Sequence, residues 1–135
     1  MRYRQVSRRA GGRCEYCLAP QVVISIRHEV EHIIPLCRGG NHLPENLALA
    51  CCACNGYKGA ATENFDALTG ESVRLFNPRT DVWSEHFEIE RTNGMIEPLT
   101  AIGRVTVGRL RLNAARHRRA RKQWLEWGWP KKARP

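Results

Sequence analysis

Two CxxC pairs place the strongest constraint on how this chain folds. Cys14 and Cys17 form the first pair, and Cys51 and Cys54 form the second. Four thiolates at this spacing are typical of a closed, tetrahedral zinc site with no open coordination position. The 33 residues between the pairs exceed the loop of an ordinary zinc ribbon, which indicates that another structural unit is inserted there.

The alternative is two unrelated CxxC pairs, one of them redox-active. A redox CxxC is expected between a strand and a helix in a thioredoxin-like order, and this chain lacks that order. Cys37 and Cys52 stand outside the CxxC spacing and are expected to be spare thiols. The N-terminus has no apolar stretch typical of a signal peptide, so we expect a cytoplasmic protein whose thiols stay reduced.

The charge balance indicates a polyanionic partner. The 135 residues suit one compact domain with a short extension, and 22 Lys and Arg against 13 Asp and Glu give a net charge of +9. Nucleic acid is the commonest partner for such a chain, and an acidic membrane surface is the rival. No apolar run approaches the roughly 18 residues that span a bilayer, so no membrane-embedded segment is expected.

The pattern of residues predicts a mixed α+β chain. Up to residue 62 we expect a helix, two strands, a short helical turn and a second helix, at residues 2–12, 21–26, 28–34, 44–50 and 55–61. Further along, residues 72–76 and 83–89 are expected to form short strands. We expect a helix that begins after Thr100 as its N-cap, and a second helix at residues 113–127.

The C-terminal part is strongly basic. From residue 104 onward there are 11 Lys or Arg and a single acid, Glu126. A charge run is usually a solvated helix face, but so dense a run of one sign repels itself without phosphate or counterions. We therefore favour phosphate binding by Arg116, Arg118, Arg119, Arg121 and Lys122. Trp124 and Trp127, three residues apart, are expected to pack on the domain.

An acid and a histidine lie side by side in the inserted segment, as Glu31 and His32. Histidine is suited to taking a proton from water near neutral pH, and a divalent ion with oxygen ligands can relieve charge on a phosphate. Neighbouring residues of a strand point to opposite faces, so the pair acts together only if the backbone bends. Pro35 and the glycines at 39–40 are compatible with such a bend.

Together these motifs resemble the HNH endonuclease family in its zinc-stapled form. They comprise the two CxxC pairs, the run EHIIP at residues 31–35, Gly39-Gly40, Asn46-Leu47, and Asn55 with Lys58 after the last cysteine. The resemblance covers residues 14 to about 60. It implies a ββα-metal (His-Me finger) nuclease core within residues 1–62, followed by an extension with short strands and basic helices at 63–135.

The resemblance also implies a role for each matching residue. His32 corresponds to the general base, Asn46 to the residue that orients it, and Glu31 and Asn55 to ligands of the catalytic ion. Lys58, one turn beyond Asn55, and Arg38 are expected to contact phosphate. Glu31 stands where Asp is more usual. Asn55 is a weaker ligand than histidine, which favours Mg²⁺ or Mn²⁺ as the catalytic ion.

The resulting hypothesis is a metal-dependent endonuclease acting on nucleic acid, with DNA as the expected substrate and RNA as the alternative. Cutting both strands would require a dimer or two visits. One rival is a zinc-stapled nucleic-acid-binding module without catalysis, which gives no reason for Glu31-His32 with Asn46 and Asn55. The other rival is a zinc-stapled interaction protein whose basic tail binds an acidic protein or lipid headgroups.

Overall fold

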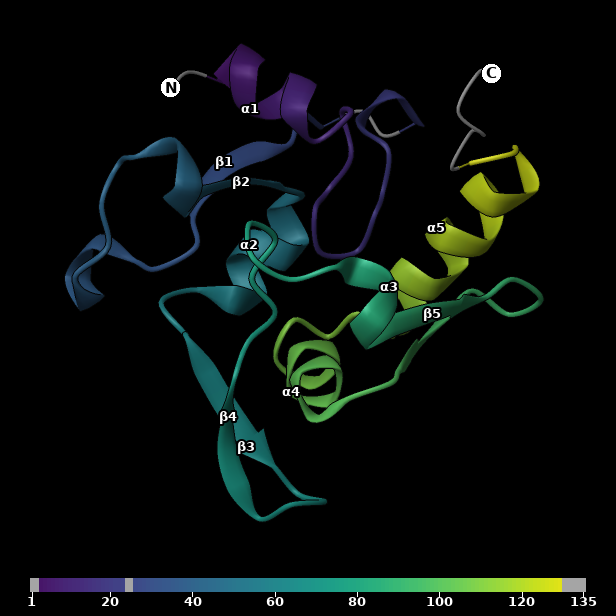
Figure 1. Cartoon of the computed structure of the whole chain (residues 1–135). Helices are drawn as coiled ribbons and strands as arrows, with labels where there is room; N and C mark the ends of the chain where they lie inside the picture. Colours follow the sequence, from purple (N-terminus) through teal and green to yellow (C-terminus); the bar gives the residue numbers. More distant parts are fainter. Residues whose placement is uncertain (1–2, 24–25, 130–135) are drawn as a thin grey trace.

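The computed structural model describes residues 3–23 and 26–129 as short helices and three two-stranded antiparallel sheets (Figure 1). The helices of at least four residues are α1 (Tyr3–Arg9), α2 (Cys52–Lys58), α3 (Trp83–His86), α4 (Ala101–Arg109) and α5 (Ala115–Glu126). The strands are β1 (Glu29–His32), β2 (Leu47–Ala50), β3 (Glu63–Asp66), β4 (Glu71–Arg74), β5 (Phe87–Glu90) and β6 (Met95–Pro98). Single 3₁₀ turns occupy η1 (Gln21–Val23), η2 (Leu36–Arg38) and η3 (Pro44–Asn46).

A ββα unit forms the first half, as predicted; the strand expected at 28–34 is confirmed as β1, but its partner is not the strand expected at 21–26. β1 pairs with β2 in the register His32 to Leu47, and α2 follows β2 directly. The predicted strand at 21–26 is wrong where the structure describes it, because Gln21–Val23 form η1, and residues 24–25 lie outside the described part. The predicted helical turn at 44–50 is only η3, after which the chain becomes β2.

In the extension, the predicted strand at 83–89 is wrong over its first half, because Trp83–His86 form α3 before β5 begins. The prediction of α4 is confirmed, since the hydroxyl of Thr100 accepts a hydrogen bond from the Gly103 amide at 3.0 Å. The helix predicted at 113–127 is confirmed as α5. Its Trp124 is buried as expected, whereas Trp127 is 59% exposed and outside the hydrophobic core.

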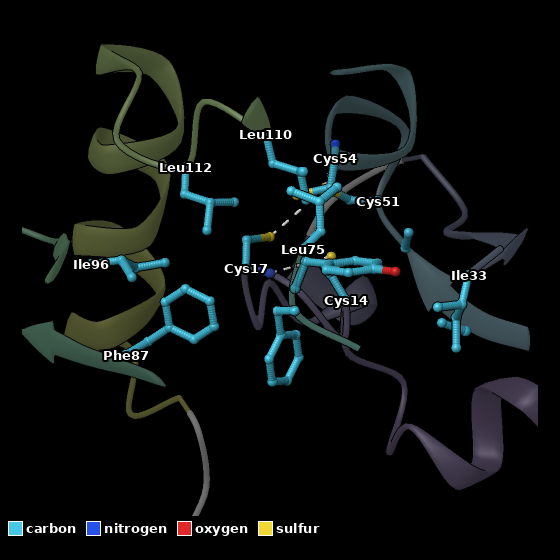
Figure 2. Packing of buried hydrophobic residues seen from close by; sticks show 14 of the residues in the cluster. Cys14, Cys17, Ile33, Cys51, Cys54, Leu75, Phe87, Ile96, Leu110 and Leu112 are labelled. Atoms are coloured by element: carbon cyan, nitrogen blue, oxygen red, sulfur yellow. Dashed lines mark hydrogen bonds between the residues drawn. The ribbon is translucent and has the colours of Figure 1, made fainter. Parts of the chain in front are cut away.

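One hydrophobic core joins both halves of the chain. It contains the four paired cysteines together with Phe76, Phe87, Ile96, Val105 and Leu110, which come from the extension (Figure 2). The indole N–H of Trp83 donates to the Tyr16 carbonyl at 2.8 Å across the same junction. The cysteine centre and the extension therefore stabilise each other through shared packing.

The turn after β1 is fixed by a close backbone approach. A side chain at Gly40 would place its Cβ only 1.8 Å from the Ile34 carbonyl oxygen, so that position requires glycine. The Asn46 side chain closes the same turn, accepting from the Ile34 N–H at 2.9 Å and donating to the carbonyls of Ile34 and Asn41. These contacts hold the backbone directly beyond His32.

Candidate functional site

The four paired cysteines converge in the interior. All four are buried, and their sulfur atoms lie within 4.8 Å of one another. Cys17 Sγ and Cys51 Sγ are 3.8 Å apart, which matches the edge of about 3.8 Å of a tetrahedron with Zn–S bonds of about 2.3 Å. The donor set thus fits a structural zinc. Cys37 and Cys52 are exposed and free, as predicted.

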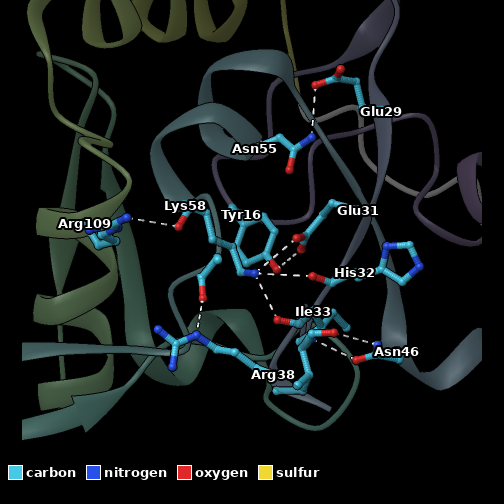
Figure 3. Close-up of polar contacts among 12 residues, drawn as sticks. Tyr16, Glu29, Glu31, His32, Ile33, Arg38, Asn46, Asn55, Lys58 and Arg109 are labelled. Carbon is cyan, nitrogen blue, oxygen red and sulfur yellow. Dashed lines mark hydrogen bonds and ion pairs between the residues drawn. The ribbon is translucent and has the colours of Figure 1, made fainter. Parts of the chain in front are cut away.

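Strand β1 presents Glu31 toward α2 (Figure 3). The Glu31 carboxylate is only 4% exposed; it accepts a hydrogen bond from the Tyr16 hydroxyl, and Lys58 Nζ lies 3.1 Å from its second oxygen. Burial raises the pKa of Glu31 despite the opposing effects of Lys58 and Tyr16. The Glu31 carboxylate is therefore held by the Lys58 ammonium and the Tyr16 hydroxyl, away from solvent.

The prediction that Lys58 contacts phosphate is wrong. Its side chain is buried, and Nζ donates to Glu31 and to the carbonyls of His32 and Ile33, at 3.4 and 2.9 Å. All three ammonium protons have acceptors, so none is left for a phosphate. Lys58 instead joins the end of α2 to the strand that carries the Glu31-His32 pair.

His32 points to the other side of β1 from Glu31, as strand geometry predicts (Figure 3). Its Nε2 lies 2.9 Å from Nδ1 of His42, and the two rings meet edge to face. Partial burial lowers the pKa of His32, and its electrostatic interactions with His42 and with the Lys58 ammonium lower that pKa further. A half-buried imidazole with a lowered pKa is neutral near pH 7 and able to accept a proton.

Asn46 does not hydrogen-bond the His32 ring, although the family resemblance implied that it orients this residue. Its three side-chain hydrogen bonds go to the backbone of Ile34 and Asn41. Asn46 therefore positions the segment that follows His32, and so acts on the ring only through the backbone.

Asn55 lies on α2 and faces β1 above Glu31 (Figure 3). Its side-chain amide donates to Glu29 Oε1 at 3.2 Å. Glu29 is two residues before Glu31 and so shares its strand face. Sequence reasoning missed Glu29, Tyr16 and the His32–His42 contact; only the i, i+2 alternation along β1 signalled Glu29.

The predicted phosphate-binding residues of α5 divide into two groups. Arg116, Arg118, Arg119 and Lys122 are exposed. The prediction for Arg121 is wrong, because it is 2% exposed and donates to the carbonyls of Gly94 and Leu112 at 2.6 and 2.8 Å. Arg38 is exposed, and its Nε donates to the Ala60 carbonyl at 2.7 Å.

The buried cysteine centre, whose donor set fits a structural zinc, and the strand–helix face beside it form a ββα domain of the nuclease type. Residues 14–61 are an HNH endonuclease domain, since the family model described as HNH endonuclease matches that segment, which is less than half of the chain. This family implies phosphodiester hydrolysis and a nucleic acid substrate. No curated protein and no solved structure matches the chain. Among the described residues, every helix is too short or too polar to cross a membrane.

Proposed function

We propose that the chain is a metal-dependent endonuclease that hydrolyses phosphodiester bonds of DNA. The observation that carries this proposal is the arrangement inside the HNH domain. A proton-accepting imidazole at His32 directly follows a carboxylate that faces the helix bearing Asn55. A zinc staple requires neither feature, so a purely structural role leaves both unexplained.

His32 is proposed as the general base that takes a proton from the attacking water. Its lowered pKa keeps it ready to accept that proton, and the hydrogen bond with His42 limits the rotation of its ring. Asn46 contributes by fixing the turn that follows His32. The leaving group is then the 3′ oxygen, giving a 5′-phosphate and a 3′-hydroxyl.

Glu31 and Asn55 are proposed to hold the catalytic Mg²⁺ or Mn²⁺, and Glu29 supplies a further oxygen beside Asn55. Carboxylate and amide oxygens are the ligands these ions prefer, so the donor chemistry fits. When bound, such an ion neutralises charge on the phosphate and on the leaving oxygen. Because Lys58 and Tyr16 already contact the Glu31 carboxylate, Glu31 must share its oxygens with them or exchange partners.

Cleavage of supercoiled plasmid tests this function. Zinc-loaded protein should nick the plasmid when Mg²⁺ or Mn²⁺ is added, and not without it. Asn55→Ala and Glu31→Gln should each lower the cleavage rate strongly, whereas Glu88→Gln, an exposed carboxylate of β5, should match the wild type. Equal rates for all four proteins would contradict the proposed metal ligands.

The binding module without catalysis is the second candidate. The buried Glu31–Lys58 pair favours it, since that pair satisfies Glu31 without an ion. The opposite directions of Glu31 and His32 on β1 also favour it, because the two side chains act together only where the backbone bends. This candidate predicts an intact plasmid under all metal conditions together with salt-sensitive DNA binding.

A further inference from the structure

Arg109 at the C-terminal end of α4 and Arg111 in the turn that follows lie against the end of α2. Arg109 Nη2 donates to the Lys58 carbonyl at 3.3 Å. The guanidinium carbon of Arg111 is 4.9 Å from the centre of the Tyr57 ring, which is 38% exposed. Both arginines belong to the extension, whereas Tyr57 and Lys58 belong to the HNH domain.

The backbone at Arg111 adopts a left-handed conformation, with φ of 50°. Glycine or asparagine is the usual residue there, because other side chains cost about 1 kcal/mol or more in this region. An arginine at this position therefore carries a backbone cost that asparagine would largely avoid. Its contact with Tyr57 leaves the N–H edge of the guanidinium available to an acceptor.

The positive charge at this place is not compensated by acids. Arg38, Arg109 and Arg111 are all exposed, and none has a carboxylate within ion-pair distance among residues 3–23 and 26–129. Arg38 and Arg109 contact the carbonyls of Ala60 and Lys58, so they surround the C-terminal end of α2.

We propose that Arg109 and Arg111 bind the phosphodiester backbone of the DNA and hold it beside the active site. This inference rests on the proposed function and assigns part of substrate binding to the extension. Lys58 provides the connection, because its carbonyl accepts from Arg109 while its ammonium contacts Glu31. A DNA backbone bound by Arg109 and Arg111 therefore lies next to the C-terminal end of α2, the helix that carries Asn55.

The test is DNA binding by fluorescence anisotropy over a salt series, with a labelled DNA duplex and all proteins in a His32→Ala background. Arg109→Gln and Arg111→Asn are compared with Arg91→Gln, which removes one exposed charge from the β5–β6 turn. Each phosphate contact contributes about 0.9 to the slope of log affinity against log salt, or about eightfold in affinity between 1 M and 0.1 M. In each single variant the magnitude of the slope should fall by about 0.9, and in the double variant Arg109→Gln/Arg111→Asn by nearly twice as much.

Thermal unfolding separates binding from folding. Arg111→Asn places a residue that tolerates a left-handed backbone, so its melting temperature should be no lower than that of the parent. Arg109→Gln keeps an N–H donor for the Lys58 carbonyl, so its melting temperature should also stay close to that of the parent.

Unchanged salt slopes, or an equal decrease in Arg91→Gln, would overturn the arginine-pair proposal. Failure of the nuclease function gives a different result: the wild type does not cut plasmid, while the slopes still fall as described. Cutting by the wild type with unchanged slopes would reject the arginine pair alone.

Discussion

Replacing Lys58 with methionine should destabilise the fold by removing the partner of a buried carboxylate. Lys58 Nζ lies 3.1 Å from Glu31 Oε2, and both side chains are at most 3% exposed. At that distance, an effective dielectric constant of about 20 gives an attraction of about 5 kcal/mol. Breaking a buried pair on one side typically costs about 3–5 kcal/mol, because an uncompensated charge is left behind.

Urea unfolding of the zinc-loaded protein measures this loss. Lys58→Met should lower the free energy of unfolding by about 3–5 kcal/mol, a large part of the roughly 5–15 kcal/mol of a typical domain. Lys122→Met, which alters an exposed lysine of α5, should change it by less than about 0.5 kcal/mol. The double variant Glu31→Gln/Lys58→Met should be more stable than Lys58→Met, because it also removes the unpaired charge.

Two results would refute this reasoning. A loss below about 1 kcal/mol in Lys58→Met would mean that the pair contributes like a surface ion pair. A double variant whose loss equals the sum of the two single losses would mean that Glu31 and Lys58 act independently.

Three further predictions concern other contacts. Asn46→Ala removes three hydrogen bonds from the turn after His32, so it should slow plasmid cleavage while zinc content, measured by metal analysis, stays unchanged. Arg121→Met leaves two buried carbonyls unpaired and should lower the free energy of unfolding by about 2 kcal/mol in urea, unlike Arg119→Met at an exposed site. The Arg104 guanidinium and the Thr69 hydroxyl hold the pKa of Asp66 well below its usual range. Asp66 therefore stabilises the fold above about pH 4 and loses this effect as the pH falls through its folded pKa, so acid unfolding of Asp66→Asn should depend less steeply on pH.

Local signals in the sequence predicted the elements that local chemistry controls. The CxxC spacing placed the four buried sulfurs, and Thr100 was correctly assigned as the cap of α4. β2 escaped prediction because its residues, LALA, are all buried and show no polar–apolar alternation. The β-branched run at 21–26 indicated a strand, but its described first part forms η1 instead.

The contacts of the site could not be read from the sequence, because they join distant residues. Lys58 and Glu31 are 27 positions apart, and nothing in either local pattern distinguishes a buried ion pair from a phosphate contact. Arg121 sits in a dense basic run, yet it is the member that turns inward to two carbonyls of the extension. Only the packing of α5 on the core determines which of these cations is buried.

The most direct test of the nuclease assignment is single-turnover cleavage of a DNA duplex by His32→Ala in Mg²⁺, with zinc content matched to the wild type. Loss of a general base should slow the chemical step by about 10²–10⁴-fold, and added imidazole should restore part of the rate. A rate equal to that of the wild type would contradict the central claim that His32 is the general base of this HNH domain. Absence of cleavage by the zinc-loaded wild type would contradict hydrolysis itself.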